Sequence, residues 1–294
     1  MKLINPSAKI VILDEQESLL QVVYKRIELA GRTCYKSEDK ITETSAKEFV
    51  DRMISNGHTA MLEHGTVYLK DVYDASSEDS WEMSIGQKYS CNKYSKVTTD
   101  NALDIRGIYV TTNYRVLVEN NWLDDLKYIC DPTEFHELRI MTKFVCDRGT
   151  SHELVRHRVF SFAQESTRYC NYSKDKFGNE LIYVIPSWIK EVQENISLDN
   201  FSDIWGNNHT GLLFKRSLLI SEKAYFELLD TGWIPQQARQ MLPNALKTEV
   251  IMTGFVCDWI NFFKLRTSLS SHPDIRKLSL SLEEQFIEQN LIKP

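Results

Sequence analysis

The sequence predicts an α+β fold, with mixed helices and a mainly antiparallel sheet in a single elaborated domain. Stretches of helical period and short β-branched or aromatic runs both occur, but they do not alternate regularly as βαβ units do. With 294 residues, of which 42% are hydrophobic, the chain is long enough to bury a substantial core. We expect one domain over residues 1–294, with insertions near 71–140 and 188–212.

Two helices are expected in the N-terminal part. Apolar residues recur at helical spacing from about residue 15, and this pattern breaks at Gly31. A capping-box signature at Ser45 opens a second helix, which stops at Gly57. His58 therefore follows a helix end, where a histidine is most simply a favourable charge on the helix dipole.

Short β-branched or aromatic runs bounded by polar residues predict strands at 67–69, 108–110, 116–118 and 142–146. Between the first two of these runs, residues 71–105 are polar and only weakly periodic. Such a segment is typical of an insertion or a long loop.

Further helices are expected toward the C-terminus. A capping-box pair, Thr150 and Glu153, predicts a short helix that leads into a charged segment. Apolar spacing predicts helices at 218–229 and over about 247–264. Pro235 suits the first turn of another helix between them.

Composition excludes several classes of protein. The 41 acidic and 35 basic residues give a formal net charge of −6, which argues against a general nucleic-acid binder. The six cysteines form no CxxC pair, so neither a disulfide framework nor a structural zinc site is expected. Without a signal-peptide pattern or a membrane-span window, we expect a soluble, cytoplasmic protein with reduced thiols.

One segment concentrates charged and hydroxyl side chains within thirteen residues: Arg156, His157, Arg158, Ser161, Ser166, Thr167 and Arg168. Guanidinium groups bind phosphate through paired hydrogen bonds, and hydroxyls complete the oxygen shell, so a phosphorylated ligand is the natural partner. The alternative is a solvated charged face whose arginines pair with Glu153 and Glu165. The residues alone leave both interpretations open.

Other chemistry is not favoured. His152 and His157 are five positions apart, about 140° around a helix, so they cannot share one metal ion and no metal site is expected. Cys170 near the arginines suggests an activated thiolate, but a small apolar residue on a strand is favoured.

Two arginines outside this segment also need an anion: Arg239, expected partly buried in a helix, and Arg266, at a helix end. Ordinary ion pairs, for example to Asp258 or Asp274, are the alternative.

Four blocks resemble motifs of the flavin-dependent thymidylate synthases. RHRVFSFAQESTRY at 156–169 is similar to the family signature, which is RHR, seven residues, Ser, and then Arg-Tyr. GHTAMLEH at 57–64, ARQMLP at 238–243 and NFFKLR at 261–266 resemble further family motifs in the same order. The resemblance implies that deoxyuridine monophosphate becomes thymidine monophosphate, with methylenetetrahydrofolate as carbon donor, FAD as hydride carrier and NADPH as reductant. It also implies a homotetramer with active sites between chains.

The resemblance implies roles for individual residues. The cofactor-binding set is His58, Arg156, His157, Arg158, Gln164 and Asn261. The substrate-binding set is Glu153, Arg156, Gln164, Glu165, Ser166, Thr167, Arg168, Arg239 and Arg266. Arg266 is the expected catalytic residue, because a fixed cation at the uracil ring favours loss of its ring-nitrogen proton. A serine without an adjacent base is a poor nucleophile, so Ser166 is expected to position the nucleotide.

Some positions depart from the family pattern. Gln164 stands where many members carry Glu, and Ala60 where Ser or Thr touches FAD. Phe255 and Cys257 replace polar residues that bind flavin in some members, so these contacts are not carried over. Ala60 and Gln164 suggest one alternative function, a catalytically silent nucleotide-binding homologue. A separate alternative is an RNA-binding module that uses the RHR cluster with exposed aromatic rings, and the negative net charge counts against it.

Overall fold

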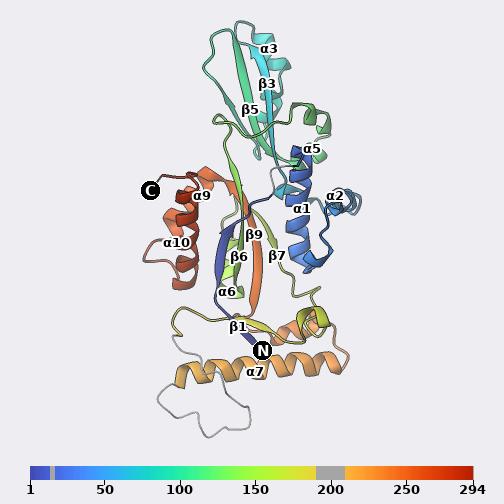
Figure 1. The fold of residues 1–294 in the computed structure, drawn as a ribbon, viewed down its shortest axis with the longest axis vertical. Helices are drawn as coiled ribbons and strands as arrows, with labels where there is room; N and C mark the ends of the chain where they lie inside the picture. Colours follow the sequence, from blue (N-terminus) through green and yellow to red (C-terminus); the bar gives the residue numbers. More distant parts are fainter. Residues whose placement is uncertain (14–16, 190–208, 294) are drawn as a thin grey trace.

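The computed structural model describes residues 1–13, 17–189 and 209–293 (Figure 1). Helices and strands are mixed along the chain rather than alternating, which confirms the α+β prediction. In chain order the elements are β1 (Lys2–Ile4), β2 (Ser7–Ile10), α1 (Leu19–Tyr35), η1 (Glu38–Lys40), α2 (Ser45–Ser55), η2 (Thr59–His64), β3 (Thr66–Asp74), α3 (Glu78–Met83), α4 (Ile85–Ser90), β4 (Lys96–Thr99), β5 (Ile105–Asn113), α5 (Tyr114–Glu119), η3 (Leu123–Tyr128), β6 (Arg139–Asp147), α6 (Arg148–Leu154), β7 (Ser161–Gln164), η4 (Asp175–Phe177), β8 (Ile182–Val184), α7 (His209–Asp230), α8 (Pro235–Ala238), η6 (Arg239–Met241), β9 (Lys247–Phe255), α9 (Val256–Arg266) and α10 (Pro273–Glu288).

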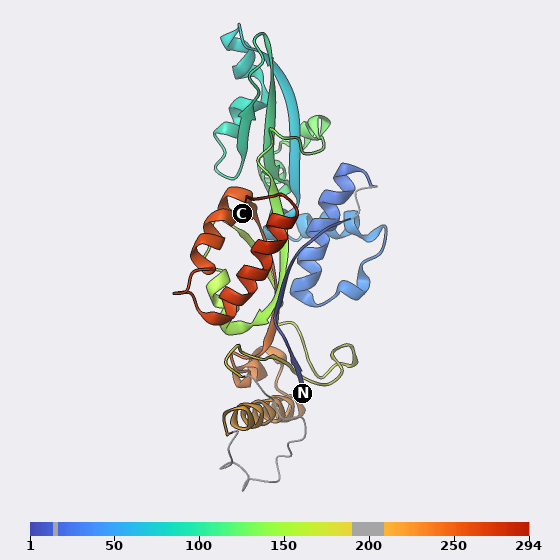
Figure 2. The ribbon, with the colours of Figure 1, turned by 60° about the vertical axis from the view of Figure 1, so that its left-hand side comes forward.

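A four-stranded antiparallel sheet in the order β2-β6-β9-β7 forms the centre of the molecule. β9 pairs with β6 from Arg139↔Phe255 to Asp147↔Lys247, and it pairs with β7 on its other side. Every residue of β9 is buried. The sheet is therefore organised around β9, with α1 on one face and α9 and α10 on the other (Figures 1 and 2).

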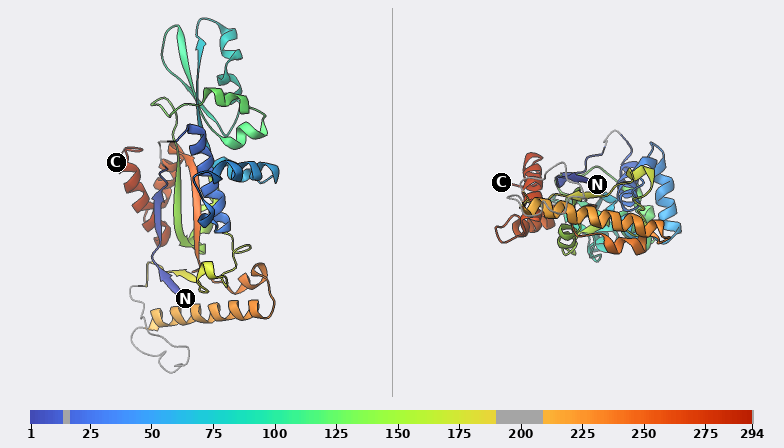
Figure 3. Two further views of the ribbon diagram at one scale, coloured as in Figure 1. Left: turned by 45° about the vertical axis from the view of Figure 1, so that its right-hand side comes forward. Right: turned by 90° about the horizontal axis from the view of Figure 1, so that it is seen from below.

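Two structures extend from opposite ends of this sheet (Figure 3). One is a lobe, residues 66–137, built on the antiparallel sheet β3-β5-β4 with its short helices. The other is the long helix α7 near the parallel pair β1 and β8. No helix in the described ranges is both long and apolar enough to cross a bilayer.

Arg139 lies where the lobe meets the central sheet. Its guanidinium group donates to the carbonyl of Glu63 at 2.9 Å and to Ser161 Oγ at 3.2 Å, and its backbone N–H donates to Tyr68 Oη at 3.1 Å. The side chain is buried, and burial lowers the pKa of Arg139 to about 10. These three bonds, two from the buried guanidinium group and one from the backbone N–H, join η2, the lobe and β7 at one point.

Several predicted elements are confirmed. The strands at 67–69, 108–110 and 142–146 are parts of β3, β5 and β6, and the helix at 218–229 is part of α7. Pro235 occupies the first turn of α8. The predicted polar stretch at 188–212 falls mostly outside the described residues.

Two predictions of element type are wrong. Residues 116–118 form part of α5 rather than a strand, because Asn113 Oδ1 accepts the N–H of Val116 at 3.2 Å and caps a helix there. Residues 247–264 are not one helix: 247–255 form β9, whose residues are buried between two strands, and the helix begins at Val256. A fully buried strand lacks the alternation of polar and apolar residues that would identify it.

Three predicted boundaries or caps are also wrong. α1 continues past Gly31 to Tyr35. The glycine does not end the helix; it allows α2 to pack closely, since an added Cβ would lie 2.5 Å from Phe49 Cζ. Ser45 lies inside α2 and bonds Glu28 Oε2 at 2.9 Å instead of capping the helix. The cap of α6 is Asp147 rather than Thr150.

Residues 71–105 are not a long loop. They contain the end of β3, then α3, α4 and β4, and they pack around Tyr89 and Trp81. That this segment is an insertion relative to other family members stays a prediction.

We expect Asn113→Ala to lower the free energy of unfolding by about 1 kcal/mol, because the first turn of α5 loses its cap. Asn113→Ser, which keeps an acceptor oxygen, should recover most of the loss. The measurement is denaturant unfolding followed by circular dichroism, with the exposed Asn101→Ala as the control. Equal stability of Asn113→Ala and the wild type would contradict the capping role.

Candidate functional site

The charged segment leaves α6 and turns back into the sheet through β7. α6 begins at the Asp147 cap, whose Oδ1 accepts the N–H of Thr150 at 2.8 Å, and it ends at Leu154. Arg156, His157 and Arg158, called the RHR turn below, therefore lie in a turn just beyond the end of this helix. Arg156 and Arg158 are exposed, and within the described ranges neither has a hydrogen bond or an ion pair.

His157 and Glu153 both contact the end of α9. Arg266 Nε donates to His157 Nε2 at 2.8 Å, Arg266 Nη1 lies 2.6 Å from Glu153 Oε2, and Arg266 Nη2 donates to the Glu153 carbonyl at 3.1 Å. Since Nε2 accepts, His157 is neutral and carries its proton on Nδ1. Burial and the Arg266 charge lower the pKa of His157 to about 4. Residues more than a hundred positions apart thus form one cluster, as the resemblance implies.

The contacts of Arg266 bear on two alternatives: an ordinary ion pair for Arg266, and a solvated charged face for the arginines of the RHR turn. Arg266 does pair with a carboxylate, but its partner is Glu153 rather than Asp258 or Asp274. Glu153 is therefore engaged by Arg266, and the exposed arginines of the RHR turn do not use it. The solvated-face interpretation required Glu153 and Glu165 to neutralise those arginines, and neither does so.

Gln164 and Glu165 are adjacent in sequence but point to opposite faces of the sheet, as strand residues do. Gln164 Nε2 donates to Ser151 Oγ at 2.9 Å and to Thr248 Oγ1 at 3.2 Å, so it lies beside α6. Glu165 is buried on the other face, where its carboxylate binds Lys247 at 2.8 Å and accepts from Tyr172 Oη at 3.1 Å. The structure separates the Glu165 carboxylate from the Glu153–Arg266 cluster.

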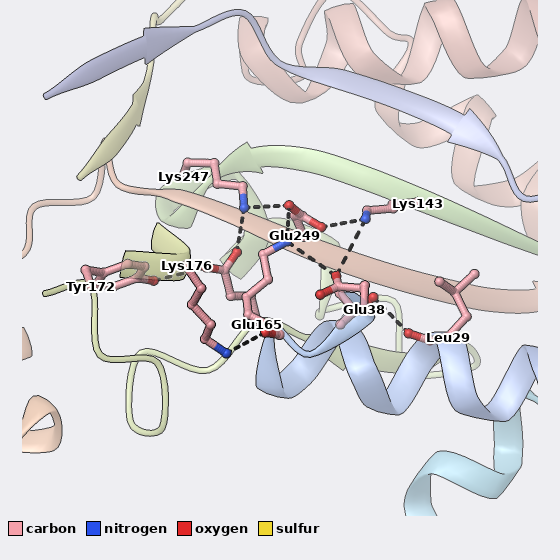
Figure 4. A network of polar contacts seen from close by, with 10 residues as sticks. Leu29, Glu38, Lys143, Glu165, Tyr172, Lys176, Lys247 and Glu249 are labelled. Atoms are coloured by element: carbon pink, nitrogen blue, oxygen red, sulfur yellow. Dashed lines mark hydrogen bonds and ion pairs between the residues drawn. The ribbon is translucent and has the colours of Figure 1, made fainter. Parts of the chain in front are cut away.

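Glu165 belongs to a lysine–carboxylate network that the sequence analysis missed (Figure 4). At its centre the Glu249 carboxylate lies 2.5 Å from each of three ammonium groups, those of Lys36, Lys143 and Lys247. Burial alone would raise the pKa of Glu249, but the charges of Lys247 and Lys36 hold it well below its usual range. Lys36, Glu165, Lys247 and Glu249 also line a cavity of about 550 Å³. The spacing of Lys247 and Glu249 on one strand would have signalled the network, had 247–255 been identified as a strand.

The second half of the charged segment lies against α1 and α8. The Ser166 N–H donates to the Cys34 carbonyl at 3.0 Å, and Ser166 Oγ accepts the N–H of Arg168 at 3.3 Å. Arg168 Nε donates to Gln236 Oε1 at 3.3 Å, which places Arg168 near the start of η6 and Arg239. Thr167 between them is buried.

The exposure of Arg239 and the surroundings of Ser166 Oγ bear on two expectations from the sequence. Arg239 is exposed, so the expectation of partial burial is wrong; η6 is a single short turn whose three residues are all exposed. Within the described part of the chain, no imidazole or carboxylate bonds Ser166 Oγ, and the positioning role of Ser166 stays a prediction.

The remaining candidate residues divide into exposed and buried groups. His58, just beyond α2, and Asn261, on the outer side of α9, are exposed. Cys170 is buried, and burial raises its pKa to about 12, so it is a thiol and not an activated thiolate. His64, which the sequence analysis did not assign, is fully buried with Nδ1 2.8 Å from Thr253 Oγ1.

The free guanidinium groups of the RHR turn determine what this surface can bind. They are donors without protein acceptors in the described structure, and they lie beside a neutral histidine and the half-buried Arg266. Such a set of donors fits an anionic, phosphate-bearing ligand.

We expect the His157 imidazole to titrate at about pH 4, and Arg266→Ala to move this pKa toward 6.5 because one of its two causes is removed. The unfolded chain takes up the same proton near pH 6.5. The contribution of His157 to stability is therefore fully present above about pH 6.5 and is lost as the pH falls toward 4. NMR titration of the imidazole protons measures this, with Lys264→Ala as the control. An imidazole that titrates near 6.5 in the wild type would contradict the Arg266–His157 hydrogen bond.

We expect Lys247→Met to lower the free energy of unfolding by about 3 kcal/mol, because it removes a cation from the buried carboxylates of Glu165 and Glu249. Adding Glu165→Gln should restore part of the loss. Lys223→Met, which removes an exposed pair with Glu227, should change stability little. Chemical denaturation of the four proteins provides the comparison, and equal effects of the two lysine substitutions would refute the role of the network.

Comparisons with known proteins agree with the family that the four sequence motifs resemble. The family model described as thymidylate synthase complementing protein matches residues 106–289. A flavin-dependent thymidylate synthase of Geobacter sulfurreducens is 30% identical over 135 residues, 46% of this chain and 50% of the relative. One of Pyrococcus furiosus is 29% identical over 149 residues, 51% of this chain and 54% of the relative. The chain thus spans about half the length of these relatives.

Other matches extend over more of the chain at lower identity. A flavin-dependent thymidylate synthase of Corynebacterium efficiens is 24% identical over 269 residues, 90% of this chain and 75% of the relative. Among solved structures, the UMP/dUMP methylase PolB from Streptomyces cacaoi bound with 5-Br dUMP matches with a TM-score of 0.43 and 15% identity, over 98% of this chain and 93% of that one. The family model covers more than half of the chain, and the chain therefore belongs to the thymidylate synthase complementing protein family, which confirms the resemblance of its motifs.

Proposed function

We propose that this protein is a flavin-dependent thymidylate synthase. It methylates deoxyuridine monophosphate to thymidine monophosphate, with methylenetetrahydrofolate as carbon donor and NADPH as reductant through FAD. The observation that carries the proposal is the contact between the RHR turn and Arg266. Two motifs separated by about a hundred residues in sequence meet through His157 and Glu153.

The residues of the RHR turn fit a flavin dinucleotide. Arg156 and Arg158 are exposed donors with no acceptor in the described structure, and a pyrophosphate supplies such acceptors. FAD, when bound, supplies hydride transfer. His58, Gln164 and Asn261 complete the proposed cofactor-binding set, with the Gln164 amide already oriented by Ser151.

Arg266 is the proposed catalytic residue. A guanidinium group held by His157 is positioned before substrate arrives, and it stabilises the negative charge that develops on the uracil ring when its ring-nitrogen proton is lost. The neutral His157 suits this role, because an imidazolium would repel Arg266. Glu153 holds the same guanidinium group in the structure, so a nucleotide that reaches Arg266 shares or replaces this contact.

The nucleotide is proposed to lie toward the second half of the segment. Ser166 and Arg168 orient it, and Arg239 holds its phosphate from a neighbouring subunit of a homotetramer. The carboxylate of Glu165 and the side chain of Thr167 are buried, so these two residues contribute through the backbone. A cytoplasmic location is part of the same proposal.

The test is to purify the protein, record its flavin absorbance and measure thymidine monophosphate formed from deoxyuridine monophosphate, methylenetetrahydrofolate and NADPH. We expect a yellow protein that turns over. Arg266→Ala should lower kcat about a hundredfold or more, because a preorganised charge is lost. Cys170→Ala is the control, and it should keep appreciable activity because its buried thiol is not ionised.

Other outcomes separate the alternatives. A protein that binds FAD and the nucleotide without turnover would be the catalytically silent homologue. A colourless protein that binds RNA but no flavin would be the RNA-binding module. Loss of all turnover in a folded Cys170→Ala variant would overturn the flavin-based assignment.

A further inference from the structure

A buried hydrogen bond closes the chain segment that carries Ser166 and Arg168. Tyr172 Oη donates to Glu165 Oε1 at 3.1 Å, across seven positions of the sequence (Figure 4). Both side chains are buried. The residues between them, 166–171, are called the 166–171 turn below. The bond between Tyr172 and Glu165 therefore joins the two ends of this turn.

The two partners of this bond are themselves held in place. Burial and the charge of Glu165 raise the pKa of Tyr172 well above its usual range, so the phenol keeps the proton that it donates. The Tyr172 ring packs against Phe177, with the centroids 5.2 Å apart. The other carboxylate oxygen of Glu165 lies 2.8 Å from Lys247 Nζ, and its backbone N–H donates to the Glu249 carbonyl at 2.9 Å. The bond thus ties the far end of the turn to β9.

The 166–171 turn presents one side to solvent. The Ser166 carbonyl accepts the N–H of Tyr169 at 3.3 Å and the N–H of Cys170 at 3.0 Å, which makes the turn tight. Thr167 and Cys170 are buried, whereas Arg168 and Tyr169 are exposed. A ligand can therefore meet only the exposed side, and the shape of that side depends on where the two ends of the turn are held.

The side chains that form the bond do not face this ligand side. Glu165 is buried on the face of the sheet opposite the Glu153–Arg266 cluster, and Tyr172 is buried beside it. An effect of their bond on ligand binding must therefore pass through the backbone of the turn. The same separation leaves the contacts of Arg266 with His157 and Glu153 independent of it.

We propose that Tyr172 is a positioning residue for the nucleotide, and that its bond to Glu165 holds the 166–171 turn in the shape in which Ser166 and Arg168 bind the nucleotide. This inference rests on the proposed function. Without the bond, the end of the turn at Tyr172 is released. A turn that takes the binding shape only part of the time binds its ligand more weakly by that fraction.

The test compares the FAD-loaded wild type with Tyr172→Phe and Tyr183→Phe. Tyr183 is the matched control, because its hydroxyl group also makes a buried hydrogen bond in the same apolar cluster, to the Leu218 carbonyl at 3.3 Å. Calorimetry gives the dissociation constant for deoxyuridine monophosphate, and turnover assays give kcat and KM. We expect Tyr172→Phe to raise the dissociation constant and KM about tenfold, as the loss of one hydrogen bond to a charged group does, with kcat and FAD affinity unchanged. Tyr183→Phe should bind the nucleotide like the wild type.

A pair of double variants tests the acceptor of the bond. Lys247→Met with Glu165→Gln keeps an amide carbonyl that accepts from Tyr172, whereas Lys247→Met with Glu165→Leu keeps no acceptor. Both lack the same charges. The variant with Gln should bind deoxyuridine monophosphate about tenfold more tightly than the variant with Leu. Equal affinities would overturn the inference, even if Tyr172→Phe does not fold.

The remaining results each overturn a specific statement. Wild-type nucleotide affinity in Tyr172→Phe would overturn this inference and leave the proposed function intact. Equal losses of nucleotide affinity in Tyr172→Phe and Tyr183→Phe would overturn it too, since they would reflect a general loss of packing. So would a loss of FAD affinity in Tyr172→Phe as large as its loss of nucleotide affinity. A wild type that binds neither deoxyuridine monophosphate nor FAD would overturn the proposed function and this inference with it.

Discussion

The pairing of β9 with β6 and β7 is the constraint on which both sides of the molecule depend. Because successive strand residues face opposite sides, Thr248 points toward α6 and Gln164, while Lys247 and Glu249 point toward α1. A shift of one residue in this register would exchange the two sets. It would bring the buried lysine–carboxylate network to the side of Arg266 and remove the polar contact that orients Gln164.

The neutral state of His157 follows from its position between an apolar cluster and a permanent cation. Its ring contacts Phe262 with the centroids 4.9 Å apart, and its Nε2 accepts from Arg266. Both surroundings disfavour a second proton. The histidine consequently works as an acceptor that orients a guanidinium group, while the arginines on either side of it have no acceptor among the described residues. The RHR turn thus contains one side chain that orients Arg266 and two that point to solvent.

Many of the elements and the family motifs could be predicted from the sequence, and the wrong predictions have physical causes. The RHR turn, Arg266 and the family were accessible because they are carried by residue type and spacing. β9 was not, because a strand buried on both faces has no alternation, and its apolar residues fit a helical period equally well. Gly31 was interpreted as a helix end, whereas it allows close packing of Phe49 against α1. Such a contact depends on a partner that the local sequence does not reveal.

Glu153 and Glu165 bind different partners in the fold, and this difference shows why the site could be predicted only in part. Both are acidic residues near the same arginines in sequence, and their charge alone does not show which of them binds a ligand and which forms an ion pair. Tertiary placement decides: Glu153 ends up against Arg266 at 2.6 Å, and Glu165 is buried with Lys247 at 2.8 Å. Because each carboxylate is already paired with a cation from another part of the chain, Arg156 and Arg158 have no acceptor within residues 1–13, 17–189 and 209–293. Their availability for a phosphate is therefore a consequence of contacts that Lys247 and Arg266 make elsewhere, and not of the RHR turn alone.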